Sequence, residues 1–259
     1  MISGAKYSML HLPLVERIYV EESRKHGKNC EKAVKTRLHQ MFGAYVQGNA
    51  HKKAFALLDS LCAGSSASTQ EISKAIMALH ASTKERLPHL EDFYTFITGH
   101  TGSVETVLDL GCGFNPFSIP YLQVQKLKSY HAYDIDTRTR DAINRFFTYL
   151  NLPPTAACAD LIVDSPAEKV DLAFMCKLIP VLEAQAAGRG FELARLLNAT
   201  FLAITYPLKS LGGRDKGMSK NYTAQFERAV ADGALGNYTV IDSAQIGNEL
   251  VYMCFRDLA

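Results

Sequence analysis

Short apolar runs alternate with amphipathic stretches through the C-terminal part of the chain. The runs at 104–110, 129–136, 155–160, 170–176 and 199–207 have the length and residue types of buried strands. Helical spacing fills the gaps between them and is clearest over 137–150, 182–198 and 222–230. Strands that alternate with helices predict a mainly parallel, doubly wound α/β sheet. Two further runs, 238–245 and 249–255, predict a terminal antiparallel hairpin and bring the sheet to seven strands.

The residues before 100 show helical periodicity instead. Between residues 28 and 48 the apolar positions recur at helical spacings: Val34, Leu38, Met41, Phe42, Tyr45 and Val46. On one continuous helix, four basic residues would share a sector of about 60° beside that stripe: Lys28, Lys32, Lys35 and His39. Further helices are expected over 51–61, 71–79 and 80–97, with a loop and helix cap at 63–69. We therefore expect a helical N-terminal domain at 1–99 and a sheet domain at 100–259.

Charge is distributed unevenly along a chain of ordinary globular composition. Residues 1–60 hold ten Lys or Arg against five Asp or Glu, whereas the remainder holds eighteen against twenty-one. A basic segment on a mildly acidic body favours a polyanionic partner, although an ordinary solvated surface explains the bias equally well. The six cysteines show no CxxC spacing, so we expect neither a metal site nor a disulfide framework. No run is long enough to span a bilayer and the start has no signal-peptide pattern, so we expect a cytoplasmic protein without a membrane partner.

The turn DLGCG, Asp109 to Gly113, directly follows the first predicted strand. Glycines at this point let the backbone pass close to a ligand at the carboxyl end of a parallel strand. Pro116 stands where a dinucleotide fingerprint needs its third small residue, and no GK[ST] follows, so neither a dinucleotide site nor a P-loop is predicted. The alternative interpretation is a tight turn without a ligand.

Acidic residues also stand at the ends of the next two predicted strands. Asp134 and Asp136 end the second strand, and Asp160 ends the third. In nucleotide-binding α/β folds a carboxylate after the second strand accepts hydrogen bonds from ribose hydroxyls. Asp134 is the better candidate for this role, because Asp136 can instead cap the following helix. Asp160, with the apolar Leu161 beside it, suits an adenine ring, and all these strand ends should converge on one crevice.

Four longer strings carry a resemblance to a known family: HASTKER (80–86), DLGCGFNP (109–116), KLIPVLEAQAAG (177–188) and YPLKSLGGRDKGM (206–218). Together they resemble the aminoglycoside-resistance 16S rRNA methyltransferases that modify N7 of guanine 1405. The resemblance spans nearly the whole chain and is loose only at the extreme N-terminus and over 220–240. It implies a class I, Rossmann-like methyltransferase fold with S-adenosyl-L-methionine as the methyl donor.

The resemblance also implies which residues bind this cofactor. The matching positions are Tyr45, His80, Ala81, Ser82, Arg86, Gly111, Asp134, Asp160, Leu161 and Gln185. The methionine end would be held by His80, Ala81, Ser82 and Arg86, with the Arg86 guanidinium paired to the cofactor carboxylate. Asp134 would bind the ribose, and Asp160 with Leu161 the adenine. Tyr45 is expected to cover the pocket from the N-terminal domain.

Basic residues are the expected RNA contacts: Lys28, Lys32, Lys35, Lys177, Lys209, Arg214 and Lys216. The last three surround the glycine pair of SLGGRDKGM, after the strand where this fold presents the target base. Such a loop suits phosphate contacts and closure around an extruded nucleotide. A flexible solvated loop is the alternative, and Lys177 is alternatively an ordinary lysine at a strand end.

Methyl transfer to guanine N7 requires no general base, because N7 carries an in-plane lone pair. We therefore nominate no catalytic side chain and expect an alignment mechanism. The resemblance implies 16S rRNA in the assembled 30S subunit as the partner of a monomeric enzyme. It also implies resistance to 4,6-disubstituted deoxystreptamine aminoglycosides. The alternatives are methylation of another rRNA base atom, such as adenine N1, and a non-catalytic protein that binds S-adenosylmethionine and RNA.

Overall fold

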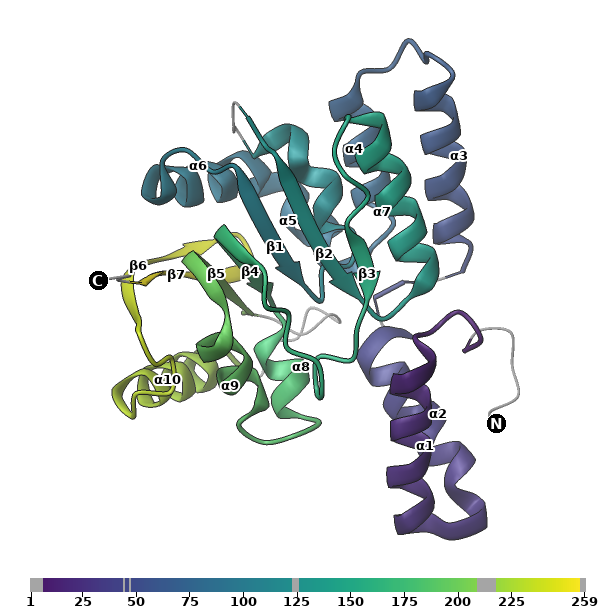
Figure 1. The fold of residues 1–259 in the computed structure, drawn as a ribbon, viewed down its shortest axis with the longest axis vertical. Helices are drawn as coiled ribbons and strands as arrows, with labels where there is room; N and C mark the ends of the chain where they lie inside the picture. Colours follow the sequence, from purple (N-terminus) through teal and green to yellow (C-terminus); the bar gives the residue numbers. More distant parts are fainter. Residues whose placement is uncertain (1–6, 44, 47, 123–125, 209–217, 257–259) are drawn as a thin grey trace.

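One seven-stranded sheet forms the centre of the computed structural model, which describes residues 7–43, 45–46, 48–122, 126–208 and 218–256 (Figure 1). The strands are β1 (Thr106–Leu110), β2 (Ser129–Asp134), β3 (Ala156–Cys158), β4 (Lys169–Cys176), β5 (Asn198–Pro207), β6 (Tyr238–Ile246) and β7 (Glu249–Arg256). Their order across the sheet is β3-β2-β1-β4-β5-β7-β6. Strands β1 to β5 pair in parallel, and β7 is antiparallel to both β5 and β6. The predicted mainly parallel sheet with a terminal hairpin is confirmed.

The order in which the chain adds strands to the sheet reverses between β1 and β4: β2 and β3 lie on one side of β1, and β4 and β5 lie on the other. Val107 of β1 lies opposite Tyr130 of β2 on one side and opposite Leu172 of β4 on the other. At such a switch point the connections leave in opposite directions, so a crevice opens beyond the carboxyl ends of the two central strands. The DLGCG turn lies at this crevice, because it directly follows β1.

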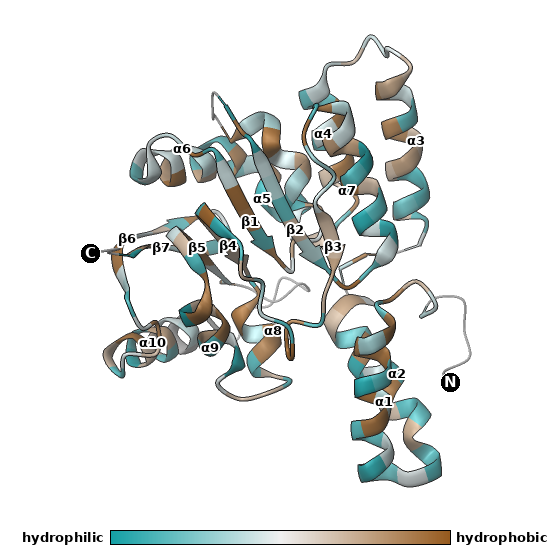
Figure 2. Ribbon diagram, viewed as in Figure 1, coloured by the Kyte–Doolittle hydropathy of each residue, from teal (hydrophilic) through white to brown (hydrophobic). Residues whose placement is uncertain are grey.

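Helices cover both faces of the sheet (Figure 1). One hydrophobic core joins the sheet to α3 (Ala50–Cys62), α4 (Thr69–Met77), α6 (Leu90–Thr101) and α7 (Thr137–Tyr149). A second core joins it to α8 (Ile179–Glu183), α9 (Arg189–Leu196) and α10 (Met218–Ala231). Figure 2 shows hydrophobic residues along β1 and β4, as expected for strands covered on both faces. Ser68 begins α4 with a reciprocal capping box to Glu71, which confirms the predicted cap.

The N-terminal helices α1 (Leu12–His26) and α2 (Cys30–Leu38) form a hairpin with its own small core, which extends away from the sheet (Figure 1). Leu14, Ile18, Val34 and Leu38 are completely or almost completely buried in it. The helices between residues 50 and 101 instead share the core of the sheet. The hydrophobic packing therefore changes near residue 43, not near the expected domain boundary at 99. No helix among the described residues is long and apolar enough to cross a bilayer.

The helix expected over 28–48 is interrupted. Lys28 lies in a short 3₁₀ turn (Gly27–Asn29) before α2, and a π-helical turn (His39–Gly43) follows α2. Gly43 packs against the His39 ring so closely that a Cβ at this position would lie 2.2 Å from Nδ1. The four basic residues therefore do not lie along one continuous α-helix.

The prediction of one helix over 182–198 is also wrong. The chain forms two helices there, α8 and α9, with a break between them. Gly188 has φ 83°, a left-handed conformation that favours glycine. The carboxylate of Glu183 accepts hydrogen bonds from the N–H groups of Gly188 (2.7 Å) and Gly190 (2.8 Å). A carboxylate that satisfies the free N–H groups at the start of α9 stabilises the break.

Candidate active site

A pocket lies at the carboxyl ends of β1, β2 and β4, where the strand order reverses. We call it the strand-end pocket. Nine of the ten residues expected to bind the cofactor line it: Tyr45, His80, Ser82, Arg86, Gly111, Asp134, Asp160, Leu161 and Gln185. The tenth, Ala81, begins α5 (Ala81–Arg86) at its edge and donates its N–H to the carbonyl of Tyr45 at 2.9 Å. Parallel topology explains why Gly111, Asp134 and Asp160 converge, because parallel strands deliver their carboxyl ends to the same side of the sheet.

The DLGCG turn forms the floor of the strand-end pocket. Gly111 has φ 61° and Gly113 has φ 50°, both in the left-handed region. A Cβ at Gly111 would lie 2.7 Å from Leu178, and a Cβ at Gly113 would lie 2.7 Å from Nε2 of His80. Both glycines are therefore required by backbone conformation and by close packing.

Asp134 connects the turn after β1 to the end of β2. Its carboxylate accepts hydrogen bonds from the N–H of Gly113 (2.9 Å) and the N–H of Asp136 (2.9 Å). Burial raises the pKa of Asp134 to about 6 despite these two donors. Asp136 caps α7 by accepting the N–H of Arg138 at 2.9 Å. The cap formed by Asp136 is the one that the sequence suggested, and it leaves Asp134 as the candidate for the ribose.

Two polar atoms that line the strand-end pocket are buried without a hydrogen bond among the described residues: Nδ1 of His80 and Oε1 of Gln185. The ring of His80 stacks on Tyr45, with centroids 5.8 Å apart and planes 12° apart. Burial, reinforced by nearby positive charge, lowers the pKa of His80 to about 3, so the ring is neutral. Buried polar atoms without partners are rare, and here they face a cavity that a polar ligand can enter.

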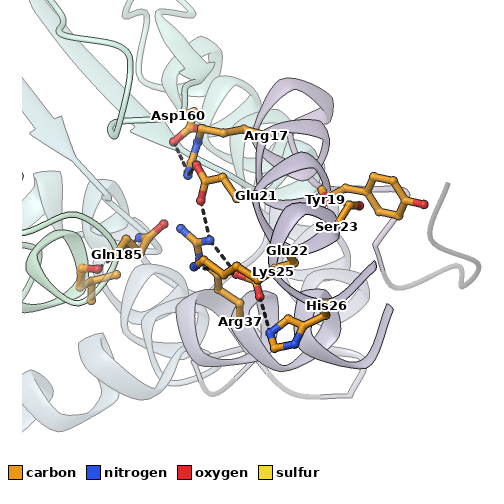
Figure 3. A network of polar contacts seen from close by, with 11 residues as sticks. Arg17, Tyr19, Glu21, Glu22, Ser23, Lys25, His26, Arg37, Asp160 and Gln185 are labelled. Atoms are coloured by element: carbon orange, nitrogen blue, oxygen red, sulfur yellow. Dashed lines mark hydrogen bonds and ion pairs between the residues drawn. The ribbon is translucent and has the colours of Figure 1, made fainter. Parts of the chain in front are cut away.

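Asp160 is held by an arginine that the sequence analysis did not nominate. Arg17 of α1 donates from Nε to Oδ2 of Asp160 at 2.5 Å and from Nη2 to Oδ1 at 3.0 Å. The Asp160 side chain is 2% exposed. Arg17 also pairs with Glu21, and Figure 3 shows the network continuing through Arg37 toward the end of α1. The helical hairpin therefore contacts the adenine end of the predicted cofactor site directly.

Comparison with known proteins identifies the family to which the chain belongs. A family model described as "Ribosomal RNA methyltransferase (FmrO)" matches residues 3–253. The chain belongs to this family of ribosomal RNA methyltransferases. The 16S rRNA (guanine(1405)-N(7))-methyltransferase of Serratia marcescens is 38% identical over 98% of this chain and 94% of its own length. The enzyme of the same name from Micromonospora rosea is 34% identical over 90% of this chain and 85% of its own length.

Solved structures agree with this assignment to the rRNA methyltransferases. The 16S rRNA methyltransferase RmtF, in complex with S-adenosyl-L-homocysteine, superposes with a TM-score of 0.84 at 35% identity. The match covers 97% of this chain and 93% of that chain. The 16S rRNA methylase RmtB gives a TM-score of 0.81 at 33% identity, covering 98% and 94% of the two chains. The class I, Rossmann-like fold expected from the sequence is confirmed.

Arg86 of this rRNA methyltransferase lines the strand-end pocket, but its guanidinium fork binds Glu249 of β7. Nε donates to Oε1 at 2.9 Å and Nη2 donates to Oε2 at 2.7 Å. Nη1 donates to Oδ1 of Asn115 at 2.6 Å, and the guanidinium lies 4.1 Å from the ring centroid of Phe93. The bidentate face that we expected to meet the cofactor carboxylate is therefore occupied by Glu249, and only the remaining N–H groups are available to a ligand.

Lys177, which we expected to contact RNA, is buried and ion-paired instead of lying on the exposed surface. Its side chain is 5% exposed, and Nζ donates to Oε2 of Glu85 at 2.8 Å and lies 3.6 Å from Oε1 of Glu249. No spacing in the sequence relates Lys177 to Glu85 or Glu249, because neither acid is near it along the chain. The geometry rules out a direct phosphate contact in this conformation and places Lys177 in the wall of the pocket.

The remaining basic residues differ in their surroundings. Lys28 and Lys32 are exposed and have no ion pair among the described residues, whereas Lys35 pairs with Glu31 at 2.5 Å. Lys209, Arg214 and Lys216 lie outside the described residues. The described part of the chain contains no cluster of three or more His, Cys, Asp or Glu that could hold a metal ion.

Proposed function

We propose that this rRNA methyltransferase transfers a methyl group from S-adenosyl-L-methionine to N7 of guanine 1405 in 16S rRNA. The observation that carries the proposal is the match to relatives named for this atom along almost the whole chain, 98% of it in the Serratia case. A modification at this position would give resistance to 4,6-disubstituted deoxystreptamine aminoglycosides. An added methyl group and a fixed positive charge both oppose the binding of a cationic drug.

The strand-end pocket fits S-adenosyl-L-methionine. Asp134 offers a carboxylate to the ribose hydroxyls, and Asp160 with Leu161 offers an acceptor and an apolar surface to adenine. The unpartnered atoms of His80 and Gln185 suit the polar methionine end. Neutral His80 can accept a hydrogen bond from an ammonium group, which a protonated imidazole cannot.

When bound, S-adenosyl-L-methionine supplies a methyl group that its sulfonium already activates. The residues of this chain then have to orient the two reactants and exclude water. Guanine N7 needs no deprotonation, so the site does not require a general base. The pKa of His80, about 3, agrees with an alignment mechanism, because so weak a base is not poised to accept a proton.

The partner in this proposal is the assembled 30S subunit, which a monomeric enzyme meets in the cytoplasm. The exposed Lys28 and Lys32 support an RNA-binding role for the helical hairpin. We infer that Arg214 and its neighbours in the glycine loop contact the extruded nucleotide.

Incubation of purified 30S subunits with enzyme and labelled S-adenosyl-L-methionine tests the proposal. Mapping of the modified nucleotide should show one methyl group at N7 of guanine 1405, and expression in a susceptible bacterium should give gentamicin and kanamycin resistance. A label at an adenine, or at another guanine atom, would replace the proposal with a different rRNA methyltransferase. An absence of label with a folded, cofactor-binding protein would favour a non-catalytic role.

A further inference from the structure

A second cavity adjoins the strand-end pocket. This outer cleft has a volume of about 1010 Å³ and lies between the helical hairpin and the sheet domain. Five residues line both cavities: Met41, Tyr45, Lys177, Val181 and Gln185. The two cavities therefore meet, and a planar group that enters the cleft can bring one edge to the pocket where the methyl donor is proposed to bind.

The walls of the outer cleft suit a nucleotide. Three cations line the side formed by the helical hairpin: Lys32, which has no ion pair among the described residues, and Lys25 and Arg37, which pair with Glu21 or Glu22. Cations at that position can approach a phosphate backbone while a base reaches inward. Tyr45 and Tyr222 also line the cleft, and aromatic rings of this kind stack on extruded bases.

An ion pair stands where the two cavities meet. Lys177 lines both of them, whereas its partner Glu85 lines only the outer cleft. Glu85 accepts from Lys177 through Oε2, and its Oε1 accepts no hydrogen bond from the described part of the chain. The Glu85 side chain is 26% exposed, so a ligand in the cleft can reach it. The pair thus presents a cationic donor near the pocket and a free acceptor further from it.

Lys177 adopts a backbone conformation that is unfavourable for a lysine. Its φ is 55°, and the conformation is fixed by hydrogen bonds from its N–H to the carbonyl (3.0 Å) and hydroxyl (3.1 Å) oxygens of Thr205. Residues other than glycine, asparagine and aspartate rarely occupy this region, and those that do cluster at functional sites. The strain is consistent with a side chain placed for recognition.

The donor of Lys177 and the acceptor of Glu85 are complementary, in this order, to the hydrogen-bonding groups of guanine. From N7, the edge of guanine presents O6, an acceptor, then N1–H and the 2-amino group, both donors. With N7 directed at the strand-end pocket, O6 would meet the Lys177 ammonium, and N1–H and the amino group would meet the Glu85 carboxylate. Adenine reverses the pattern, because its 6-amino group would face the lysine and its N1 acceptor would face the glutamate.

The geometry points to Glu85 and Lys177 as the residues that select guanine as the target base, with Glu85 reading N1–H and the 2-amino group. This inference rests on the proposed function, because it takes a methyl donor in the strand-end pocket as given. It assigns a role in substrate choice, not in proton transfer.

The test is single-turnover methylation of 30S subunits by the parent enzyme, by Glu85→Gln and by Glu91→Gln. Glutamine keeps the size of the side chain but presents one acceptor without charge. We expect Glu85→Gln to methylate guanine roughly 10- to 100-fold more slowly, the range for losing a bidentate base contact. Glu91 is exposed at the start of α6 and lines neither cavity, so its variant should match the parent.

Subunits reconstituted with hypoxanthine at the target position make the test specific. Hypoxanthine keeps N7, O6 and N1–H but lacks the 2-amino group. The parent should prefer guanine over hypoxanthine by roughly 10-fold, and Glu85→Gln should lose most of that preference. An unchanged preference in Glu85→Gln would overturn the inference.

Binding measurements separate recognition from a structural role. The affinity of Glu85→Gln for S-adenosyl-L-homocysteine should equal that of the parent, and a parallel fall in cofactor affinity and rate would overturn the inference. Failure of the parent itself to methylate N7 of guanine would instead overturn the proposed function. The two failures are therefore distinguishable.

Discussion

Arg17 and Asp160 form a bidentate ion pair between residues 143 positions apart in the chain. Arg17 belongs to the helical hairpin, which has its own hydrophobic core, and Asp160 lies beyond β3 in the sheet domain. This contact fixes the carboxylate proposed to bind adenine. It also attaches the helical hairpin to the wall of the strand-end pocket.

Replacing Arg17 tests this connection. Arg17→Ala should weaken S-adenosyl-L-homocysteine binding by roughly 10-fold, because the nearly buried Asp160 carboxylate loses its two charged donors and keeps, among the described residues, only the N–H of Ile162. Calorimetry gives the affinity, with Arg24→Ala as a control at an exposed position of the same helix. An affinity equal to the parent would show that Arg17 attaches the hairpin without positioning Asp160.

Asp134 should be the most sensitive single position for the cofactor. Asp134→Ala removes the acceptor for the ribose hydroxyls, and two hydrogen bonds to a charged group correspond to about 2–4 kcal/mol of binding free energy. Asp141→Asn, which is exposed on α7 and lies outside the strand-end pocket, serves as the control. Calorimetry that finds equal affinity for Asp134→Ala and the parent would remove Asp134 from the site.

The pH dependence of cofactor binding should follow Asp134. Burial raises the pKa of this carboxyl from 3.8 to about 6, and only the ionised form accepts from both ribose hydroxyls. Affinity should therefore fall as the pH drops through about 6, and Asp134→Asn should flatten the profile. Asp109 has a pKa of about 6 for the same reason, but it does not line the strand-end pocket.

The same shift has the opposite sign for folding. An acid whose pKa is raised by folding binds its proton more tightly in the native state, so its contribution favours folding at low pH and is lost as the pH rises from about 4 to 6. The free energy of unfolding, measured by denaturant titration at several pH values in this window, should therefore change with pH more steeply in one protein than in the other when the parent is compared with Asp134→Asn. An identical pH dependence of the free energy of unfolding in the two proteins would show that folding does not raise the pKa of Asp134.

The buried pair between Arg86 and Glu249 should support the fold. Glu249→Gln leaves the Arg86 guanidinium buried with weaker partners, and breaking a buried pair in this way costs about 3–5 kcal/mol in the free energy of unfolding. Lys128→Met breaks an exposed pair with Glu105 and should change the free energy of unfolding far less, because solvent screens these two charges. Similar losses in the two variants, measured by denaturant unfolding, would contradict this ranking.

The exposed lysines of the hairpin should contribute to ribosome binding. Lys28 and Lys32 have no ion pair among the described residues, so each is available to a phosphate. Reversing both to Glu should weaken 30S binding and flatten its salt dependence, because fewer counterions are released. Cofactor affinity should stay unchanged, since neither lysine lines the strand-end pocket. Equal binding of variant and parent at two salt concentrations would leave these lysines as ordinary surface residues.

The sequence predicted the elements whose pattern is local. The strands, the capping box at Ser68 and the acids at the strand ends all follow from short-range spacing and from the rule that parallel strands end together. Helix α1 was not predicted. The break between α8 and α9 was missed because it depends on the Glu183 carboxylate folding onto the next turn.

The partners of the site residues were harder to predict than the residues themselves. Arg86 and Lys177 were both nominated, but their roles depend on Glu249, which reaches them from the last strand. No spacing rule relates position 249 to position 86. Electrostatic pairing across a fold is decided by tertiary packing, and a single sequence contains no record of it.

The packing of the site at Gly113 depends on the absence of a Cβ atom. Any other L-residue would bring a Cβ within 2.7 Å of the His80 ring, at a backbone angle that such residues rarely adopt. In a library of random substitutions, this rRNA methyltransferase should therefore tolerate no other residue at position 113, not even alanine, while the charged surface of the hairpin accepts many changes. If the proposed resistance holds, variants selected for it in bacteria would then diversify in the α1–α2 hairpin and retain glycine at position 113.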